Sequence, residues 1–274
     1  MRDVTVIIVS FNTKEELEAC LASMAAAPPA VAHRIVVVDN ASSDGTPAAV
    51  RQNWPVVRLI ASDRNLGFAA ANNLAIREAD TEFVLLLNSD TLVPAGAIDA
   101  LVGALESDPG AAAVGPRLVG ADGRPEISFG PMMGPFNELR QKVLGRLYDR
   151  RVAAAVSRVT RMTRERQYPD WVSGACLLVR RADALAAGLL DDRYFLYAED
   201  VDFCAALRSI GRRILFTPDA EVVHLRGASG RKRRVETNYA YRRSQLAFYE
   251  RHHPRWAPVL RAYLRLRGEL PPPA

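Results

Sequence analysis

Two short runs of polar residues carry acidic groups that could do chemistry. Residues 198–202 read Ala-Glu-Asp-Val-Asp, and residues 88–90 read Asn-Ser-Asp. A histidine, His224, follows two valines further along the chain. Carboxylate and imidazole groups hold divalent cations and abstract protons in enzymes. These residues therefore indicate a site with a general base and a metal ion.

Glu199 and Asp200 are the candidates for the base. They begin a predicted helix directly after the aromatic run at 195–197. The helix N-terminus favours a carboxylate, whereas aromatic surroundings raise its pKa toward the range of a general base. The alternative is N-terminal capping by acidic residues, which explains one carboxylate more easily than three among the four positions 199–202.

Asp90 and His224 are the candidates for the metal site. Asp90 follows a leucine run that is predicted to be a buried strand. A carboxylate there can hold Mg²⁺ or Mn²⁺ against a diphosphate with few other protein ligands. Imidazole favours Mn²⁺ modestly. A histidine at a strand end could equally be a half-buried residue with ordinary hydrogen bonds, so local sequence leaves both interpretations of His224 open.

Apolar runs alternate with segments of helical periodicity in the first half of the chain, which predicts a doubly wound, mostly parallel α/β sheet. Thr46 and Pro47 are predicted as an N-cap and the first helical residue. Regular structure is expected again from 171 to 180, in an acidic helix at 199–210, in a strand near 213–216 and in a C-terminal helix near 236–252. In the first half, strands are predicted at 4–9, 35–38, 56–61 and 83–87, and helices at 14–27, 46–54 and 68–79.

Polar clusters follow the predicted strands of the first half, at the edge where such sheets bind ligands. Asp39 could accept a hydrogen bond from the imide N–H of a base, and Ser10 and Asn12 could contact base and ribose. A pyrimidine nucleotide fits this pattern. Asn, Asp, Ser and Gly are also common turn residues, but four clusters at one edge favour a ligand site. The clusters are 10–12, 39–44, 65 with 67, and 88–90.

Charge divides the chain into an acidic and a basic part. Residues 1–136 hold 9 Lys/Arg and 16 Asp/Glu, which leaves 27 and 15 for the rest. Residues 137–166 hold nine basic and three acidic side chains among apolar residues at helical spacing. This predicts a basic amphipathic helix or helix pair, lying either on an anionic membrane or on the domain with a solvated basic face. Further arginines and a lysine extend the basic face at Arg226, Arg231, Lys232, Arg233, Arg234, Arg261, Arg265 and Arg267.

Several classes of protein are disfavoured by what the 274 residues lack. There is no apolar run of roughly 18 residues, so the protein is expected in the cytoplasm. The three cysteines lack CxxC spacing and are expected to be buried thiols. Neither GxGxxG nor a phosphate-loop motif occurs. A sugar nucleotidyltransferase would need a Gly-rich basic loop after the first strand, and residues 10–16 do not form one. A nucleic-acid-binding module would explain the basic half but not the acidic crevice, so no nucleic acid partner is expected.

The order of these motifs resembles the family 2 inverting glycosyltransferases of the GT-A fold. Within that family it is similar to the rhamnosyltransferase-like branch, which acts on polyprenyl-diphosphate-linked sugars. The resemblance covers residues 4–250. Its motifs are VIIVSFN at 6–12, VDNASSDGT at 38–46, NLGF at 65–68 with Asn72 and Asn73, LNSD at 87–90, WVSGAC at 171–176 with Arg180 and Arg181, and FLYAEDVD at 195–202.

The resemblance implies roles for individual residues. Asp39 would contact the base, Asp90 would be the metal-binding Asp of a DxD motif with His224 as a second ligand, and Asp200 would be the catalytic base. Asn88 replaces the first Asp of DxD, as in the rhamnosyltransferase-like branch, and would bond ribose or a water on the metal. The implied nucleotide-sugar site comprises Ser10, Asn12, Asp39, Ser42, Asn65, Gly67, Asn72, Asn88, Ser89 and Asp90, and the implied acceptor site comprises Trp171, Gly174 and Asp202.

The expected reaction is inverting transfer of a hexose, for example L-rhamnose, from a dTDP- or UDP-sugar to a lipid-linked or cell-surface glycan, with Mn²⁺ or Mg²⁺. The protein is then expected to lie peripherally on the inner face of the cytoplasmic membrane. One glycosyltransferase domain is predicted over 1–235, and a C-terminal helix and tail over 236–274. Within the domain, 1–125 would bind the nucleotide-sugar, 126–170 would be the basic insertion, and 171–235 would bind the acceptor.

Overall fold

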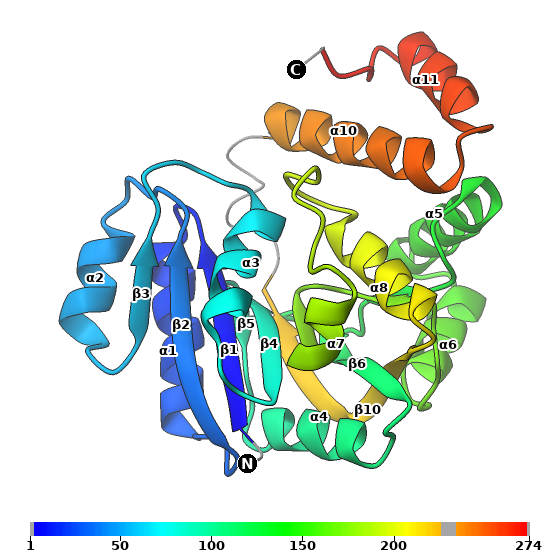
Figure 1. Ribbon diagram of the computed structural model, residues 1–274. Coiled ribbons are helices and arrows are strands. Elements are labelled where there is room, and N and C mark those ends of the chain that lie inside the picture. The colour runs from blue at the N-terminus through cyan, green and yellow to red at the C-terminus, as the bar shows by residue number, and fades with distance from the viewer. Residues whose placement is uncertain (1–2, 226–233, 273–274) are drawn as a thin grey trace.

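The computed structural model describes residues 3–225 and 234–272, with a central mixed sheet that has helices on both faces (Figure 1). The strand order is β3-β2-β1-β4-β9-β6-β10-β5. A separate two-stranded sheet pairs β7 (Phe129–Gly130) with β8 (Trp171–Val172). The strands of the main sheet are β1 (Asp3–Ser10), β2 (Ala32–Asp39), β3 (Arg58–Ala61), β4 (Phe83–Asn88), β5 (Thr91–Leu92), β6 (Ala111–Val119), β9 (Cys176–Arg180) and β10 (Arg213–His224).

Strand direction is parallel through the first half of the sheet, as predicted. β1 pairs in parallel with both β2 and β4, and β2 pairs in parallel with β3. The carboxyl ends of these strands therefore share one edge. β9 runs antiparallel to β4 and β6, which makes the sheet mixed at its centre.

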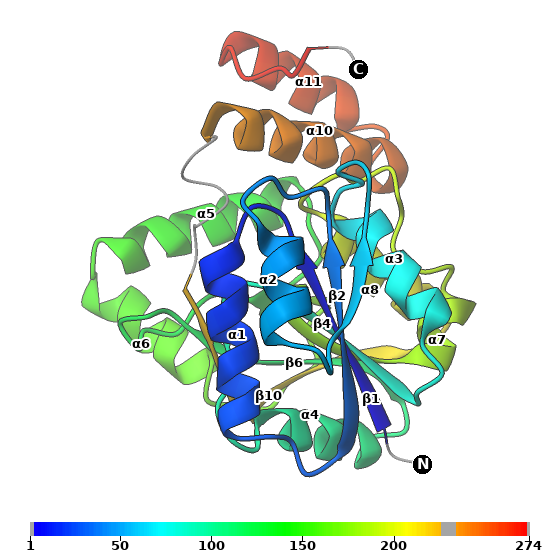
Figure 2. The ribbon, with the colours of Figure 1, turned by 90° about the vertical axis from the view of Figure 1, so that its left-hand side faces the viewer.

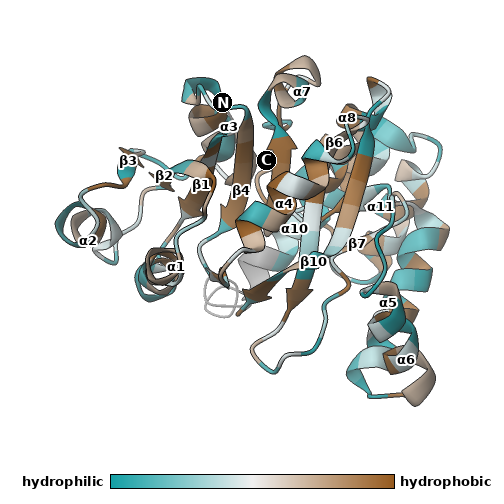
Figure 3. Cartoon of the chain, turned by 90° about the horizontal axis from the view of Figure 1, so that it is seen from below, coloured by the Kyte–Doolittle hydropathy of each residue, from teal (hydrophilic) through white to brown (hydrophobic). Residues whose placement is uncertain are grey.

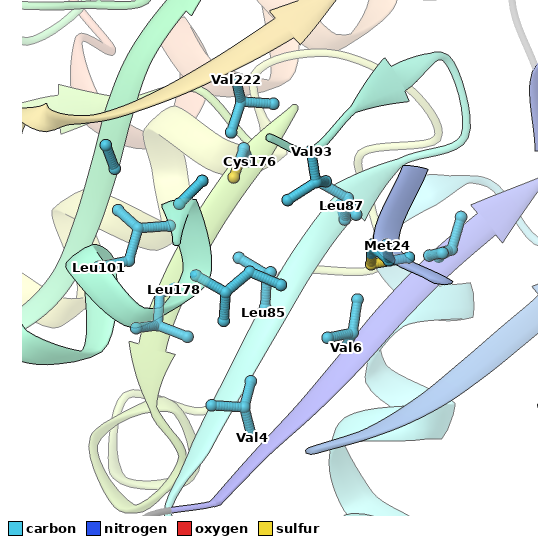
Figure 4. Packing of buried hydrophobic residues seen from close by; sticks show 14 of the residues in the cluster. Val4, Val6, Met24, Leu85, Leu87, Val93, Leu101, Cys176, Leu178 and Val222 are labelled. Carbon is cyan, nitrogen blue, oxygen red and sulfur yellow. The ribbon is translucent and has the colours of Figure 1, made fainter. Parts of the chain in front are cut away.

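Helices complete three layers because successive strand residues point to opposite faces. On one face, Val4, Val6 and Ile8 of β1 pack with α1, α2 and α4, and Figure 4 shows part of this cluster. On the other face, Ile7 packs with α3, α7 and α8. The central strands are accordingly hydrophobic along most of their length (Figure 3). The helices are α1 (Lys14–Ala26), α2 (Thr46–Asn53), α3 (Phe68–Glu78), α4 (Ala97–Glu106), α5 (Pro135–Asp149), α6 (Ala153–Met162), α7 (Arg181–Ala186), α8 (Glu199–Ser209), α10 (Arg234–His252) and α11 (Ala257–Leu266).

Several boundaries differ from the sequence-based expectation. Thr46 is the first residue of α2 rather than its N-cap, because Asp44 accepts hydrogen bonds from both its N–H and its hydroxyl, and Gly45 takes the cap position with φ 85°. β3 begins at Arg58, two residues later than predicted, and Val56 is 91% exposed. β10 is longer than the predicted strand at 213–216 and ends at His224.

The basic segment folds as a helix pair, α5 and α6, at one side of the sheet (Figure 1). The C-terminal part contributes α10 and also α11, which was not predicted. A small apolar cluster joins α10 and α11 to the start of α8 through Phe248, Ala257 and Ala198. Within residues 3–225 and 234–272, no helix combines the length and apolar character needed to span a bilayer.

Candidate active site

The loops after β1 and β2 are joined by polar contacts at one edge of the sheet. Ser10 and Asp39 are paired across the two strands and are both almost fully buried. Asp39 Oδ2 accepts a hydrogen bond from the Ser42 N–H at 3.0 Å, and the Asn12 N–H donates to Ser42 Oγ at 2.9 Å. Asn12 has φ 55°, a left-handed conformation that Asn tolerates better than most residues. These bonds hold both loops in place at the sheet edge.

The second oxygen of Asp39 has no partner within the described part of the chain. Asp39 is 1% exposed, and its Oδ1 is buried without a hydrogen bond. Buried polar atoms are nearly always satisfied, so an orphaned carboxylate oxygen at the sheet edge suits an N–H of a ligand. The geometry fits the predicted contact to a base.

The loop before α3 is bonded to the loop after β2 through Asn40, a residue that the sequence analysis did not single out. Asn40 accepts from the Leu66 N–H at 2.8 Å and donates to the Gly67 carbonyl at 3.1 Å. Asn65 accepts from the Gly67 N–H at 2.9 Å. Gly67 has φ 82°, and a Cβ there would lie 2.5 Å from the Phe195 carbonyl. Only glycine fits this approach between the loop before α3 and the loop that precedes α8.

A chain of hydroxyl groups connects the end of β1 to the 88–90 turn. Ser10 Oγ lies 3.0 Å from Thr13 Oγ1, which lies 2.9 Å from Ser89 Oγ. The Asn88 N–H donates to the Ala175 carbonyl at 2.9 Å, which ties the turn to the start of β9. The predicted Ser10 and Ser89 positions thus lie in one network.

Asp90 and His224 come together, although 134 residues separate them (224 − 90). His224 Nε2 lies 3.3 Å from Asp90 Oδ1, and the ring's Nδ1 lies 3.2 Å from Glu126 Oε2. Burial opposes a charge on the ring, but the hydrogen bonds and negative charges of Asp90 and Glu126 outweigh it and raise the pKa of His224 to about 9. The imidazole is therefore held on both sides by carboxylates.

The chemistry of this group suits a hard divalent cation. Carboxylate oxygen and imidazole nitrogen are ligands of Mn²⁺, and Mg²⁺ is commonly bound by one or two carboxylates together with substrate phosphates. Among the residues that the structure describes, no group of three His, Cys, Asp or Glu side chains could hold a metal by itself. Phosphate oxygens of a ligand would have to complete the coordination.

Glu126 is a second residue that the sequence analysis missed. It is 9% exposed and lies just before β7. A carboxylate on the outer nitrogen of a histidine fixes the ring orientation and the tautomer that faces a metal. No local pattern around position 126 signals this role, because its partner lies 98 residues away.

Asp200 lies in the first turn of α8 with its carboxylate held by backbone groups. Its Oδ2 accepts from the Gly174 N–H at 2.9 Å, and its Oδ1 accepts from the Val201 N–H at 2.8 Å. Burial raises the pKa of Asp200 above its usual value, and these hydrogen bonds limit the rise. A Cβ at Gly174 would lie 3.2 Å from Asp200 Cβ, so Gly174 leaves room for this arrangement.

Glu199 lies beside Asp200 but is in a different environment. It is 6% exposed, and its Oε2 has no hydrogen-bond partner in the described structure. Burial, and then the charge of Asp200, raise the pKa of Glu199 well above its usual value. The residues before them, Tyr197 and Ala198, both have positive φ, a conformation that costs energy for non-glycine residues. Asp200 is therefore the carboxylate of the pair that is better suited to carry negative charge.

The comparison with protein families agrees with this geometry. The family described as "Glycosyl transferase family 2" matches residues 5–168, more than half of the chain. The chain belongs to this family. A curated relative from Mycobacterium tuberculosis, "N-acetylglucosaminyl-diphospho-decaprenol L-rhamnosyltransferase", is 33% identical over 281 aligned positions, which cover 97% of this chain and 91% of the relative. The protein is a glycosyltransferase, as the sequence motifs predicted.

Solved structures show the fold of this glycosyltransferase to be GT-A, as predicted. A mannosyltransferase from Pyrobaculum calidifontis, in complex with GDP-Man and Mn²⁺, has a TM-score of 0.61 at 23% identity, covering 95% of this chain and 68% of that one. GalNAc-T7 with UDP, GalNAc and Mn²⁺ has a TM-score of 0.60 at 16% identity, covering 83% and 44%.

The remaining predicted residues of the glycosyltransferase make contacts with their own neighbours. Asn72 donates to the Phe68 carbonyl at 2.9 Å and leaves its Oδ1 buried without a partner in the described structure. The Trp171 indole donates to the Pro131 carbonyl at 2.9 Å. Asp202 is 2% exposed and faces α10. The basic residues at 226 and 231–233 lie outside the described residues, as does the side chain of Arg234.

Proposed function

We propose that this glycosyltransferase moves L-rhamnose from dTDP-L-rhamnose to a polyprenyl-diphosphate-linked sugar with inversion. The observation that carries the proposal is the alignment of almost the whole chain with a rhamnosyltransferase. It is supported by the places of three carboxylates: Asp39 and Asp90 come at or just after the ends of the two strands that flank β1, and Asp200 is bonded to Gly174 just before β9. The relative's lipid acceptor and sugar supply the substrate classes.

Asp200 is the base of the proposed reaction. Its carboxylate oxygens are aimed by the Gly174 and Val201 N–H groups, and burial favours proton uptake. As the acceptor hydroxyl attacks the anomeric carbon, Asp200 takes its proton, and the bond to the diphosphate breaks on the opposite side. A well-placed base contributes typically about 10²–10⁴-fold to the rate.

Asp39 and the residues bonded to it select the donor in this proposal. Its free Oδ1 accepts the imide N–H of thymine or uracil, while Ser10 and Asn12 line the ribose side. Asp90 and His224 would hold Mn²⁺ or Mg²⁺, which neutralises charge on the departing diphosphate. Because the acceptor is lipid-linked, the enzyme would work peripherally at the inner face of the cytoplasmic membrane.

The direct test is transfer from defined donors to a short-chain polyprenyl-diphospho-N-acetylglucosamine in detergent with Mn²⁺. We expect a product one rhamnose heavier from dTDP-L-rhamnose, with inverted anomeric configuration by NMR, and product formation slower by about 10²-fold or more with Asp200→Asn. UDP- and GDP-sugars serve as donor controls. Product only from another donor would overturn the assignment of the sugar, and retention of configuration would overturn the role of Asp200.

A further inference from the structure

Large apolar side chains are exposed along two helices outside the active site. Phe136 is 70% exposed and Leu266 is 90% exposed, so these helices present hydrophobic groups that the fold does not bury. Clusters of this kind mark interaction sites, whereas scattered exposed residues do not. On α5 the exposed apolar residues are Phe136, Leu139, Val143 and Leu147, and on α11 with its N-cap they are Trp256, Val259, Tyr263 and Leu266.

The spacing of these residues puts each set on one side of its helix. Intervals of three and four residues separate neighbours in both sets, which makes one continuous stripe per helix. The stripes meet where the Phe136 and Trp256 rings lie edge to face at 6.0 Å between centroids. From this region both helices run toward the left-hand side of Figure 2, with α5 below α10 and α11 above it.

Packing inside the protein does not account for either stripe. α11 uses a different side, with Ala257 and Leu264 buried, to contact the rest of the molecule. α6 is the contrasting case, because its Ala155 and Val159 are buried against Tyr148 of α5. The structure therefore divides the basic segment at 137–166: α6 packs on the domain, whereas α5 keeps an exposed apolar stripe.

Basic side chains border the two stripes. Arg140 and Arg146 of α5, together with Arg255 and Arg265 beside and within α11, are exposed and have no acidic partner within the described residues. α11 contains no acidic residue. Tyr263 and Trp256 add aromatic rings of the kind that lie at the level of lipid headgroups. An apolar stripe with a cationic border fits an anionic lipid surface better than another protein or water.

The stripes are connected to the catalytic loop through one cluster of side chains. Met132 and Met133, just before α5, and Leu260 of α11 pack against the cluster that contains Ala198, the residue directly before Glu199. The Ser244 hydroxyl of α10 also donates to the Leu196 carbonyl at 2.8 Å. Both helices are thus linked to the start of α8 through this cluster, and α10 lies between α11 and α8 (Figure 1).

We propose that α5 and α11 together form a docking surface for an anionic bilayer, with their apolar stripes entering the headgroup region. The proposal rests on the proposed function in that a polyprenyl-linked acceptor would be presented at the same bilayer. It assigns the contact to α5 and α11, and it excludes α6.

The test is co-sedimentation of the purified full chain with phosphatidylglycerol–phosphatidylcholine vesicles and with phosphatidylcholine vesicles. The wild type should bind the anionic vesicles, less so at high salt. Two double variants should each weaken vesicle binding by at least ~10-fold: Leu139→Glu with Val143→Glu on α5, and Val259→Glu with Leu266→Glu on α11. The reason is that a carboxylate is costly to bury in lipid and is repelled by anionic headgroups.

Two control variants carry the same kind of change elsewhere. Leu185→Glu with Ile210→Glu alters two other exposed apolar side chains, and Arg158→Glu with Arg161→Glu reverses charge on α6. Both should bind vesicles within about threefold of the wild type if the contact is local. Circular dichroism melting verifies that every variant is folded, and transfer to a short-chain acceptor in detergent should stay unchanged in all of them.

Three results would overturn the docking surface. They are absence of vesicle binding by the wild type, wild-type binding by the α5 and α11 variants, and light scattering that shows these variants splitting a dimer of this chain. Failure of the proposed function looks different, because vesicle binding would then follow the expected pattern while no rhamnose is transferred to the short-chain acceptor.

Discussion

Asp200 and Glu199 are neighbours in sequence whose surroundings give them different chemistry. Asp200→Asn should lower kcat by about 10²-fold or more with donor binding nearly unchanged, because the base is lost while the nucleotide contacts remain. Glu199→Gln should keep kcat within a few-fold, since burial already favours the neutral acid that Gln resembles. Steady-state kinetics of both variants measures this, and the opposite ranking would move the role of base to Glu199.

The same burial of Glu199 predicts a pH-dependent stability. A carboxyl with its pKa raised in the folded state stabilises the fold below its unfolded pKa, and this contribution is lost as pH rises through the folded pKa. Gln does not titrate. Glu199→Gln should therefore gain melting temperature relative to the wild type as pH rises from about 4.5 to 8. A melting-temperature difference that is constant over this range would contradict the burial of an ionisable Glu199.

Glu126 should control the affinity of the metal site through His224. Glu126→Gln keeps a hydrogen-bond acceptor for Nδ1 but removes the charge, so the affinity for Mn²⁺ should fall about 10-fold. Glu126→Ala removes both the acceptor and the charge, so the affinity should fall by up to about 100-fold. Titration of Mn²⁺ in the presence of dTDP, followed by electron paramagnetic resonance, measures it directly. Glu221→Gln, which changes an exposed glutamate on the same strand as His224, is the matched control. Equal affinity in all variants would remove Glu126 from the site.

At the scale of elements, α8 is attached to α10 by a buried charged group. Asp202 accepts from Tyr194 OH at 3.2 Å and lies 2.6 Å from His252 Nε2 and 2.9 Å from Arg251 Nη1. Asp202→Ala should cost about 2 kcal/mol, since it leaves a partly buried His252 and the buried Tyr194 hydroxyl without their acceptor, while Arg251 keeps its ion pair with Asp191. Chemical denaturation measures the loss, with Asp219→Ala as an exposed acidic control.

The contact between Asp202 and His252 also bears on how α10 is held against the first turn of α8, which contains Glu199 and Asp200. If the 202–252 contact holds α10 against α8, amide hydrogen exchange in α10 should increase in Asp202→Ala more than in α1, which lies on the other face of the sheet. Unchanged exchange in α10 would show that the cluster around Phe248 suffices to hold it.

At the scale of the whole molecule, ligand binding should couple the loops after β1 and β2 to the 88–90 turn. In the proposed complex, dTDP with Mn²⁺ would bridge these loops to Asp90, so it should raise the melting temperature, equivalent to about 2.7 kcal/mol at 100 times Kd. A chelator, or Asp90→Ala, should remove most of that gain while leaving the melting temperature of the free protein nearly unchanged. A full shift in excess chelator would argue against a metal at Asp90 and His224.

Much of the sheet, and the strand-end places of several candidate residues, followed from local sequence. Strands β1, β2 and β4 were predictable because an unbroken apolar run of a few residues identifies a strand that is buried on both faces. Polar residues such as Asp39 and Asp90 were predictable for the same local reason, since they stand where those runs stop. Membership in the glycosyltransferase family also followed from the ordered motifs.

Contacts between distant segments were decided only by the tertiary structure. The pairing of Glu126 with His224, the approach of Asp202 to His252, and the antiparallel entry of β9 between β4 and β6 join residues many positions apart. The same holds for the two halves of the basic segment, where α6 buries its apolar side and α5 leaves its stripe exposed. Helical and strand periodicity reports which side of an element is apolar, because that depends on neighbours in sequence. Which surface, if any, covers that side depends on how the whole chain closes around it, and that is a property of the folded molecule.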